Sequence, residues 1–347
     1  MKKAISILIV LAAVLSVTSC AGKNKEEITE ASVSPHAERE TVTAERKPNE
    51  SGVAASGDNT GIHWILYNDG ELDITGAGRW DASEQVLAYA EMIKKVCFSE
   101  GISIVGQEAF KGCKNLKELS LPESMQIIEE QAFSGCNVQA LNFGKNVASF
   151  SADAFDECEI TDIKISADNA YYSTDRYGVI FNKAKTELVM YSDGFRMNSY
   201  TVPSTVERIG ENAFLGNEKL VSIDFSDSLI QIGARAFADC ENLREISLPQ
   251  QITLIGESAF ENCTSLKEVE FPETLQVIGD NSFAGCTEIT QVSLPKSVTT
   301  VGTKAFADSV EKVYYAGSKT AWSAVWVGDK AFVNASIIFG EKDPKPE

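Results

Sequence analysis

The stretch Ile232–Pro249 reads IGARAFADCENLREISLP, and its pattern recurs through most of the chain. The pattern is apolar-Gly-x-x-Ala-Phe-x-x-Cys-x-x-Leu-x-x-Val-x-Leu-Pro, and most successive copies lie 23 residues apart. Its phenylalanine stands at eight positions, the last in a degraded copy: Phe110, Phe133, Phe155, Phe214, Phe237, Phe260, Phe283 and Phe306. A fixed period of this length is typical of a solenoid, in which each unit buries its apolar face only against its neighbours. The sequence therefore predicts a stacked repeat with extended surfaces and no ready-made catalytic pocket.

Each copy of the pattern is expected to form one turn of the solenoid, which we call a coil, with a glycine, a buried phenylalanine and a short strand. We expect Gly233 to lie at a sharp turn or at a positive φ, which glycine tolerates. Phe237 is expected on a brief helical turn, pointing into the stack. Leu243, Ile246 and Leu248 have the spacing of leucine-rich repeats, so Ile246 and Leu248 should alternate inward on a short strand.

The net charge of the chain argues against one class of partner. The 347 residues carry a formal net charge of −19. Such a chain repels phosphate backbones, so no nucleic-acid partner is expected.

The N-terminus predicts export. Residues 1–19 contain two lysines and a short apolar run, which is the pattern of a signal peptide. The sequence VTSCAG ending this run resembles a bacterial lipobox, which implies that Cys20 is lipidated; the alternative is a plain signal peptide. Residues 20–60, poor in large apolar side chains, are expected to form a disordered tether.

Many positions recurring together make the chain similar, over roughly residues 61–340, to the BspA-like leucine-rich repeat family of bacterial surface proteins. The stretch HWILYNDGELDITGAG, from His63 to Gly78, resembles that family's N-terminal cap hairpin. This resemblance implies a right-handed coil of short parallel strands and short helical turns, with caps at both ends. The expected parts are an N-terminal cap and half-repeat at 61–98, repeats at 99–315 with an irregular insertion at 166–200, a C-terminal cap at 316–340 and a disordered tail at 341–347.

Six cysteines share one position of the repeat: Cys113, Cys136, Cys158, Cys240, Cys263 and Cys286. This periodicity favours a ladder of buried thiols. Disulfides between neighbouring coils are an alternative, and zinc is disfavoured because no histidine accompanies the cysteines. Cys97 aligns with Ser120 on the outward side of a strand, so it is expected to be an accessible thiol or a harmless surface residue.

No constellation of catalytic residues is evident. The only histidines are His36 and His63, and no phosphate-binding glycine loop or Cys-x-x-Cys pair occurs. The sequence therefore predicts a protein that is not an enzyme, with no cofactor and no metal.

Two surfaces are candidates for partner binding. The first is the outward position of each strand, read as a docking face or as an ordinary solvated face; it comprises Ser120, Asn142, Lys164, Asp224, Ser247, Glu270 and Ser293. The second is the insertion, where Phe155 and Phe214 are 59 residues apart although two repeats need 46. It is rich in aromatic residues, including Tyr171, Tyr172 and Tyr177, and its pattern predicts a strand–turn–strand. The aromatic residues indicate either a binding surface or a structural variation of the repeat.

The resemblance implies a lipid-anchored protein of the bacterial cell envelope, exposed at the cell surface, that adheres to host or neighbouring cells through a host matrix or cell-surface protein. Glycan binding and a structural role within the envelope are the alternatives.

Overall fold

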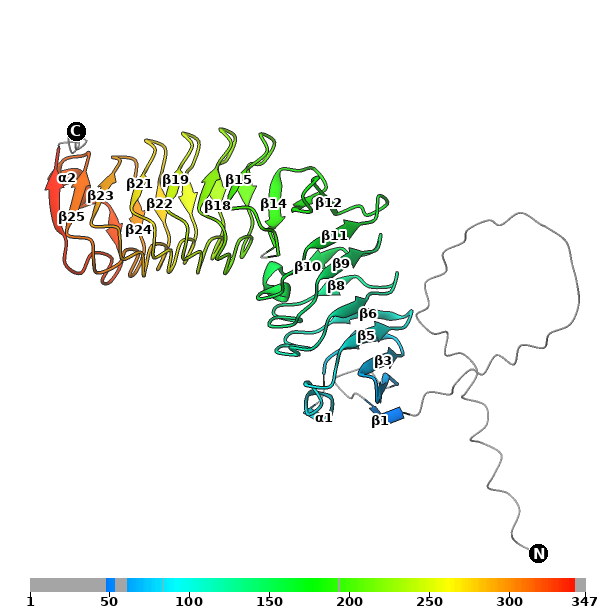
Figure 1. Ribbon diagram of the computed structural model, residues 1–347. Coiled ribbons are helices and arrows are strands. Elements are labelled where there is room, and N and C mark those ends of the chain that lie inside the picture. Colours follow the sequence, from blue (N-terminus) through cyan, green and yellow to red (C-terminus); the bar gives the residue numbers. More distant parts are fainter. Residues whose placement is uncertain (1–47, 54–60, 83, 193, 341–347) are drawn as a thin grey trace, which may run out of the picture. The chain divides into compact units, whose positions relative to one another are not determined.

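The computed structural model describes residues 48–53, 61–82, 84–192 and 194–340. The expected signal peptide, Cys20, most of the expected tether and the tail at 341–347 lie outside these residues. Most coils of the described chain contribute one strand to each of two rows of strands, which we call the long-strand side and the short-strand side (Figure 1). This arrangement confirms the predicted repeat solenoid of about 23 residues per turn.

The long-strand side consists of three sheets, in the orders β1-β2-β3-β5-β7, β9-β11 and β15-β17-β19-β21-β23-β25-β27. Their bounds are β1 Pro48–Val53, β2 His63–Tyr67, β3 Glu71–Thr75, β5 Lys95–Phe98, β7 Glu118–Ser120, β9 Ala140–Phe143, β11 Asp162–Ile165, β15 Ser199–Thr201, β17 Ser222–Asp224, β19 Glu245–Ser247, β21 Glu268–Glu270, β23 Gln291–Leu294, β25 Lys312–Tyr315 and β27 Ser336–Phe339.

The short-strand side consists of two sheets, in the orders β10-β8-β6-β4 and β12-β13-β14-β16-β18-β20-β22-β24-β26. Their bounds are β4 Gly78–Trp80, β6 Ile102–Val105, β8 Ile127–Ile128, β10 Ser149–Phe150, β12 Tyr172–Thr174, β13 Ile180–Asn182, β14 Glu187–Met190, β16 Arg208–Ile209, β18 Gln231–Ile232, β20 Leu254–Ile255, β22 Val277–Ile278, β24 Thr300–Val301 and β26 Trp326–Val327.

Helix is scarce. The described residues contain α1 (Glu84–Leu87), the 3₁₀ helix η1 (Ala152–Phe155) and α2 (Lys319–Trp322), each of four residues. In the described residues, therefore, no helix could cross a bilayer. Most copies of the repeat form a hydrogen-bonded turn where a brief helical turn is expected.

The repeated phenylalanines form a stack through the core. Phe237 is fully buried, and its ring lies 4.7 Å from that of Phe214 and 5.1 Å from that of Phe260, centroid to centroid. These spacings match the distance between neighbouring strands of a sheet, so each ring packs on its counterpart in the next coil. Ile246 and Leu248 are also buried, as their alternation predicts.

The glycine of the repeat is needed for a different reason from the one expected. Gly233 and Gly256 do not have a positive φ. A Cβ on Gly256 would lie 2.6 Å from the carbonyl carbon of Gly233, and a Cβ on Gly233 would lie 2.9 Å from that of Gly210. The expected positive φ is therefore wrong, and glycine is needed here because it permits close approach of backbones in neighbouring coils.

The insertion contains a hairpin and then restores the repeat. β12 pairs with β13 and β13 with β14, both antiparallel, in agreement with the expected strand–turn–strand. β14 then pairs in parallel with β16, as a regular coil would. Tyr191, 23 residues before Phe214, occupies the phenylalanine position and stacks on Phe214 at 4.8 Å.

At the N-terminal end, β2 and β3 form an antiparallel hairpin at the stretch that resembles a cap. β1 lies within residues 20–60, where the composition predicts a disordered tether, and it pairs antiparallel with β2, which follows those residues. Such pairing uses main-chain groups, so composition alone does not reveal it.

Candidate partner-binding surfaces

The strand register gathers the outward residues of the long-strand side into rows, which we call the candidate sheet face. Lys164 lies opposite Asn142 on the neighbouring strand, and Asp224, Ser247, Glu270 and Ser293 follow one another in register. All six are exposed, because residues at alternate positions of these strands point away from the core. Ser120 is half-buried.

One position of this face is not evident from the repeat pattern alone. Thr201 on β15 pairs in register with Asp224 and donates a hydrogen bond from Oγ1 to its Oδ2 at 3.3 Å. Its distance of 23 residues from Asp224 is the signal that could have identified it. The face thus begins again directly after the insertion.

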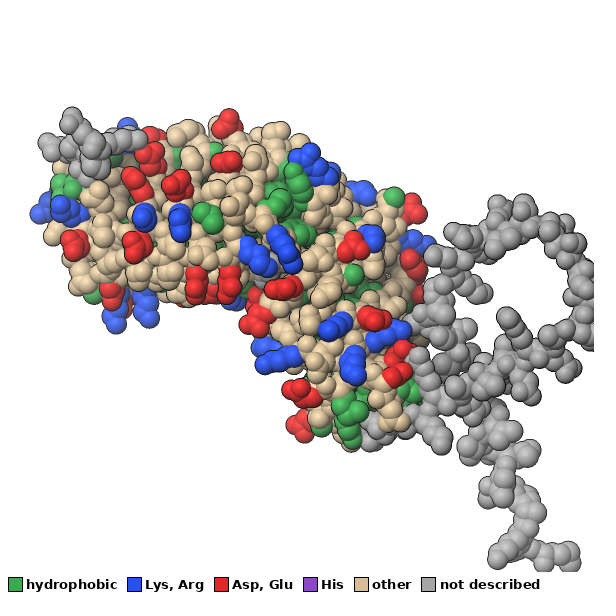
Figure 2. All heavy atoms as spheres, in the orientation of Figure 1, with side chains coloured by type: hydrophobic (Ala, Val, Ile, Leu, Met, Phe, Trp, Pro, Cys, Tyr) green, Lys and Arg blue, Asp and Glu red, His purple; other side chains and the backbone are tan. Residues whose placement is uncertain are grey.

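The charge on this surface is mixed. Lys164 forms an exposed ion pair with Asp162 at 2.6 Å, and Glu245 lies in register opposite Glu268. Figure 2 shows acidic and basic side chains interspersed over the face in view. A surface of this kind lacks the field of one sign that steers a strongly charged ligand.

The insertion divides its aromatic residues between core and solvent. Tyr171 and Tyr177 are 51 % and 44 % exposed, and the guanidinium carbon of Arg176 lies 4.5 Å from the ring centroid of Tyr177. Tyr172 is half-buried and packs edge-on against Phe150 at 5.1 Å. Of the three candidate residues, two are therefore available to a partner, while the third helps to attach the hairpin to β10.

A recess of about 450 Å³ opens beside the two looser copies of the repeat. Its lining includes Glu129 and Ser151, which stand where other copies have the close-packing glycine. Arg79 donates to both carboxylate oxygens of Glu129, at 2.5 and 2.6 Å, and this pairing lowers the pKa of Glu129.

The seven described cysteines are all reduced and buried. Five thiols at the shared repeat position donate to the phenylalanine carbonyl of the preceding coil; they belong to Cys136, Cys158, Cys240, Cys263 and Cys286. Burial raises the pKa of the Cys113 thiol to about 11. These thiols therefore lack the accessible thiolate that redox chemistry requires.

Cys97 differs from expectation. It aligns with Ser120 as predicted, but it is only 3 % exposed, so the expected surface thiol is wrong. Glu71 and Asp73 on the neighbouring strand β3 place carboxylate oxygens within 4.8 Å of its sulfur.

Comparisons with known proteins agree with this architecture. The family model described as the BspA-type leucine-rich repeat region matches residues 83–178 and 189–311, in six copies. No curated protein has significant sequence similarity to the chain.

Solved structures share the fold. A leucine-rich repeat protein from Eubacterium ventriosum is 20 % identical, with a TM-score of 0.58 over 85 % of this chain and 96 % of that one. A leucine-rich cell surface protein from Faecalibacterium prausnitzii is 22 % identical, with a TM-score of 0.54 over 80 % and 98 %. The pneumococcal vaccine antigen PcpA is 17 % identical, with a TM-score of 0.51 over 84 % and 89 %.

The gap in the family match, between residues 178 and 189, falls within the hairpin of the insertion. The coils on both sides of the hairpin carry the family's repeat with its stacked phenylalanines, and the coils after it also have the close-packing glycines. The chain is therefore a member of the BspA-type leucine-rich repeat family.

Proposed function

We propose that this chain is a non-enzymatic lipoprotein of the bacterial cell surface that binds another protein through the candidate sheet face. The observation that carries the proposal is the continuous row of exposed polar residues from Thr201 to Ser293, held in register by parallel strands. Because parallel strands already hold the backbone of this row, binding a partner would need little further ordering of the chain, which lowers the cost of association. The cell-surface description of the Faecalibacterium protein supports the location.

The test combines capture with substitutions. The chain beginning at Ala21 would be immobilised and exposed to host-cell, mucus and bacterial-surface extracts, and captured proteins would be identified and remade pure. Binding of the pure partner should weaken at least 10-fold in a double variant Asp224→Lys/Glu270→Lys. The matched control, Glu207→Lys/Glu218→Lys, changes charge equally away from this face and should bind normally. Equal binding by all three proteins would contradict the proposal.

A second candidate is glycan binding at the insertion, which the exposure of Tyr171 and Tyr177 beside Arg176 favours. Exposed aromatic faces stack on sugar rings, so Tyr171→Ala/Tyr177→Ala should abolish binding to a glycan array. Loss there, with the sheet-face variant unaffected, would assign binding to the insertion instead.

A further inference from the structure

The stack of aromatic rings ends, at the C-terminal end of the solenoid, on a ring that is incompletely covered. This last ring belongs to Phe332, and its centroid lies 5.2 Å from that of Phe306. Phe306 is 3 % exposed, whereas Phe332 is only half-buried. At the N-terminal end, by contrast, Trp64 and Trp80 are both buried. The last coil therefore leaves part of the core open, and a solenoid needs a cover at such a position.

The last coil also presents apolar side chains to solvent. Trp326, Val327 and Val333 are 56 %, 38 % and 52 % exposed, and they are three of the seven large apolar residues that are exposed in the described chain. A terminal coil ordinarily has a polar outer surface. Residues 316–340 nevertheless contain just three charged side chains, those of Lys319, Asp329 and Lys330. We call the surface formed by β26, β27 and the residues between them the end face (Figure 1).

The end face has a free strand edge as well. In the described chain, β26 is the last strand of the short-strand side and β27 is the last strand of the long-strand side. The N–H groups of Ser336 and Gly340 donate to carbonyl oxygens on the side of β25. Because successive residues of a strand direct their main-chain groups to opposite sides, those of Ile337 and Phe339 point away from β25. Such an edge is a template for another strand.

We infer that the end face binds the end face of a second copy of this chain, in a closed two-fold dimer. The sequence that follows β27, EKDPKPE from Glu341 to Glu347, has no large apolar side chain to cover this surface, and its prolines lack the N–H that a strand edge requires. A second copy supplies an identical apolar patch and an identical free edge, which a two-fold axis brings together. Two basic and one acidic side chain per face give little repulsion, although the whole chain has a net charge of −19.

The two-fold axis determines the register of the two β27 strands. In an antiparallel pair, residues whose main-chain groups face one another exchange both hydrogen bonds. Ile337 of one copy then pairs with Phe339 of the other, and Ile338 lies opposite Ile338 at the axis. Ile338 is in register with Tyr314, on the outward side of the sheet. The long-strand side thereby continues from one copy into the next, and this contact does not depend on the proposed binding function.

Sedimentation velocity over a 100-fold range of concentration tests the association. The chain beginning at Ala21 is used, since a lipid on Cys20 would itself cause association. We expect a monomer–dimer equilibrium with no larger species. Trp326→Lys/Val333→Lys should weaken the dimer at least 10-fold while keeping the circular dichroism spectrum. The matched control, Leu87→Lys/Ile230→Lys, makes the same change at two exposed apolar residues elsewhere and should leave the dimer intact.

A cysteine at the axis tests the register. Cα atoms of a non-hydrogen-bonded antiparallel pair lie about 4.5 Å apart, which a disulfide can span. Ile338→Cys should therefore form a disulfide-linked dimer in oxidised glutathione, and the seven described native cysteines do not interfere because they are buried. Ser247→Cys, exposed on the same side of the sheet but in the middle of the array, should not form one.

Three outcomes would overturn the inference. The first is a monomer at every concentration, with no more cross-linking at Ile338→Cys than at Ser247→Cys. The second is open-ended polymers, since a two-fold contact closes with two copies. The third is a monomer whose tryptophan fluorescence shifts to the blue only when phosphatidylglycerol vesicles are added, with the shift lost in Trp326→Lys/Val333→Lys, which would assign the end face to a lipid surface instead.

Discussion

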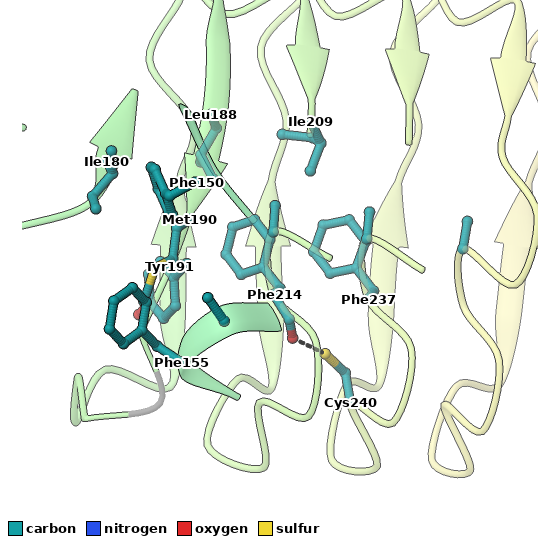
Figure 3. Packing of buried hydrophobic residues seen from close by; sticks show 14 of the residues in the cluster. Phe150, Phe155, Ile180, Leu188, Met190, Tyr191, Ile209, Phe214, Phe237 and Cys240 are labelled. Atoms are coloured by element: carbon teal, nitrogen blue, oxygen red, sulfur yellow. Dashed lines mark hydrogen bonds between the residues drawn. The ribbon is translucent and has the colours of Figure 1, made fainter. Parts of the chain in front are cut away.

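The thiol of Cys240 donates a hydrogen bond to the carbonyl oxygen of Phe214, 3.1 Å away in the preceding coil (Figure 3). The same oxygen accepts from the N–H of Asn217 at 3.1 Å, so it serves its own coil and the next. The phenylalanine stack and the cysteine ladder are therefore linked, since the backbone carbonyls of five repeat phenylalanines each accept a hydrogen bond from the thiol of the following coil. Cysteine suits this position because it is small, largely apolar and able to donate a weak hydrogen bond.

Substitution of Cys240 tests this bond. Cys240→Ala removes the donor and leaves a small void, so the free energy of unfolding should fall by about 1 kcal/mol. Cys240→Ser keeps a donor of similar size and should lose less stability than alanine. Urea denaturation of both variants measures the difference. A serine variant less stable than the alanine variant would show that apolar packing, rather than the hydrogen bond, determines the residue.

The ring stack makes a larger contribution. Phe237→Ala should lower the free energy of unfolding by about 3–5 kcal/mol, because a fully buried ring in contact with two others is lost. Ser247→Ala, on the exposed face of the same coil, should change it by less than about 0.5 kcal/mol. Similar denaturation midpoints for the two variants would refute the inward placement of Phe237.

Two glycines of the chain are required for different physical reasons, one for its backbone conformation and the other for close packing between coils. Gly112 has φ +75°, and no atom lies within 4 Å of the place that a Cβ would take, so Gly112→Ala should cost about 1–2 kcal/mol from conformation alone. Gly256 has an ordinary φ, but its Cβ would collide with the Gly233 backbone at 2.6 Å. Gly256→Ala should therefore be the more destabilising change when both are compared by thermal unfolding. The opposite order would mean that neighbouring coils can move apart readily.

Periodicity in the sequence accounts for most of the fold. Residues such as Phe237, Ile246 and Leu248 recur in phase, and a repeat that cannot bury its apolar face alone must stack. The role of Gly233 could not be predicted, because a pattern shows that glycine is required but not whether φ or a neighbouring backbone requires it. The repeat alignment also does not reveal that the sulfur of Cys97 lies within 4.8 Å of carboxylate oxygens of Glu71 and Asp73 on β3.

The insertion is the part of the fold that the repeat pattern predicts least well. Tyr191 and Thr201 each lie 23 residues before their counterparts Phe214 and Asp224, but this coil does not match the pattern because tyrosine replaces the phenylalanine. The candidate sheet face followed from strand alternation alone. The small cavity lined by Phe155 and Tyr191 lies where the insertion interrupts the stack of rings, and no spacing in the sequence predicts it.

Stability should depend on pH through Asp156. Its pKa rises from 3.8 to about 6 on folding, so its favourable contribution is complete below pH 3.8 and is lost as the pH rises through 6. At pH 7, Asp156→Asn should therefore be more stable than the wild type, because it removes a carboxylate that folding must bury with its charge. At pH 3.5 both proteins carry a neutral group at this position, so the difference between them should vanish. Urea denaturation at the two pH values measures it, with Asp224→Asn as the exposed control. A difference that persists unchanged at pH 3.5 would show that the asparagine acts through packing rather than through charge.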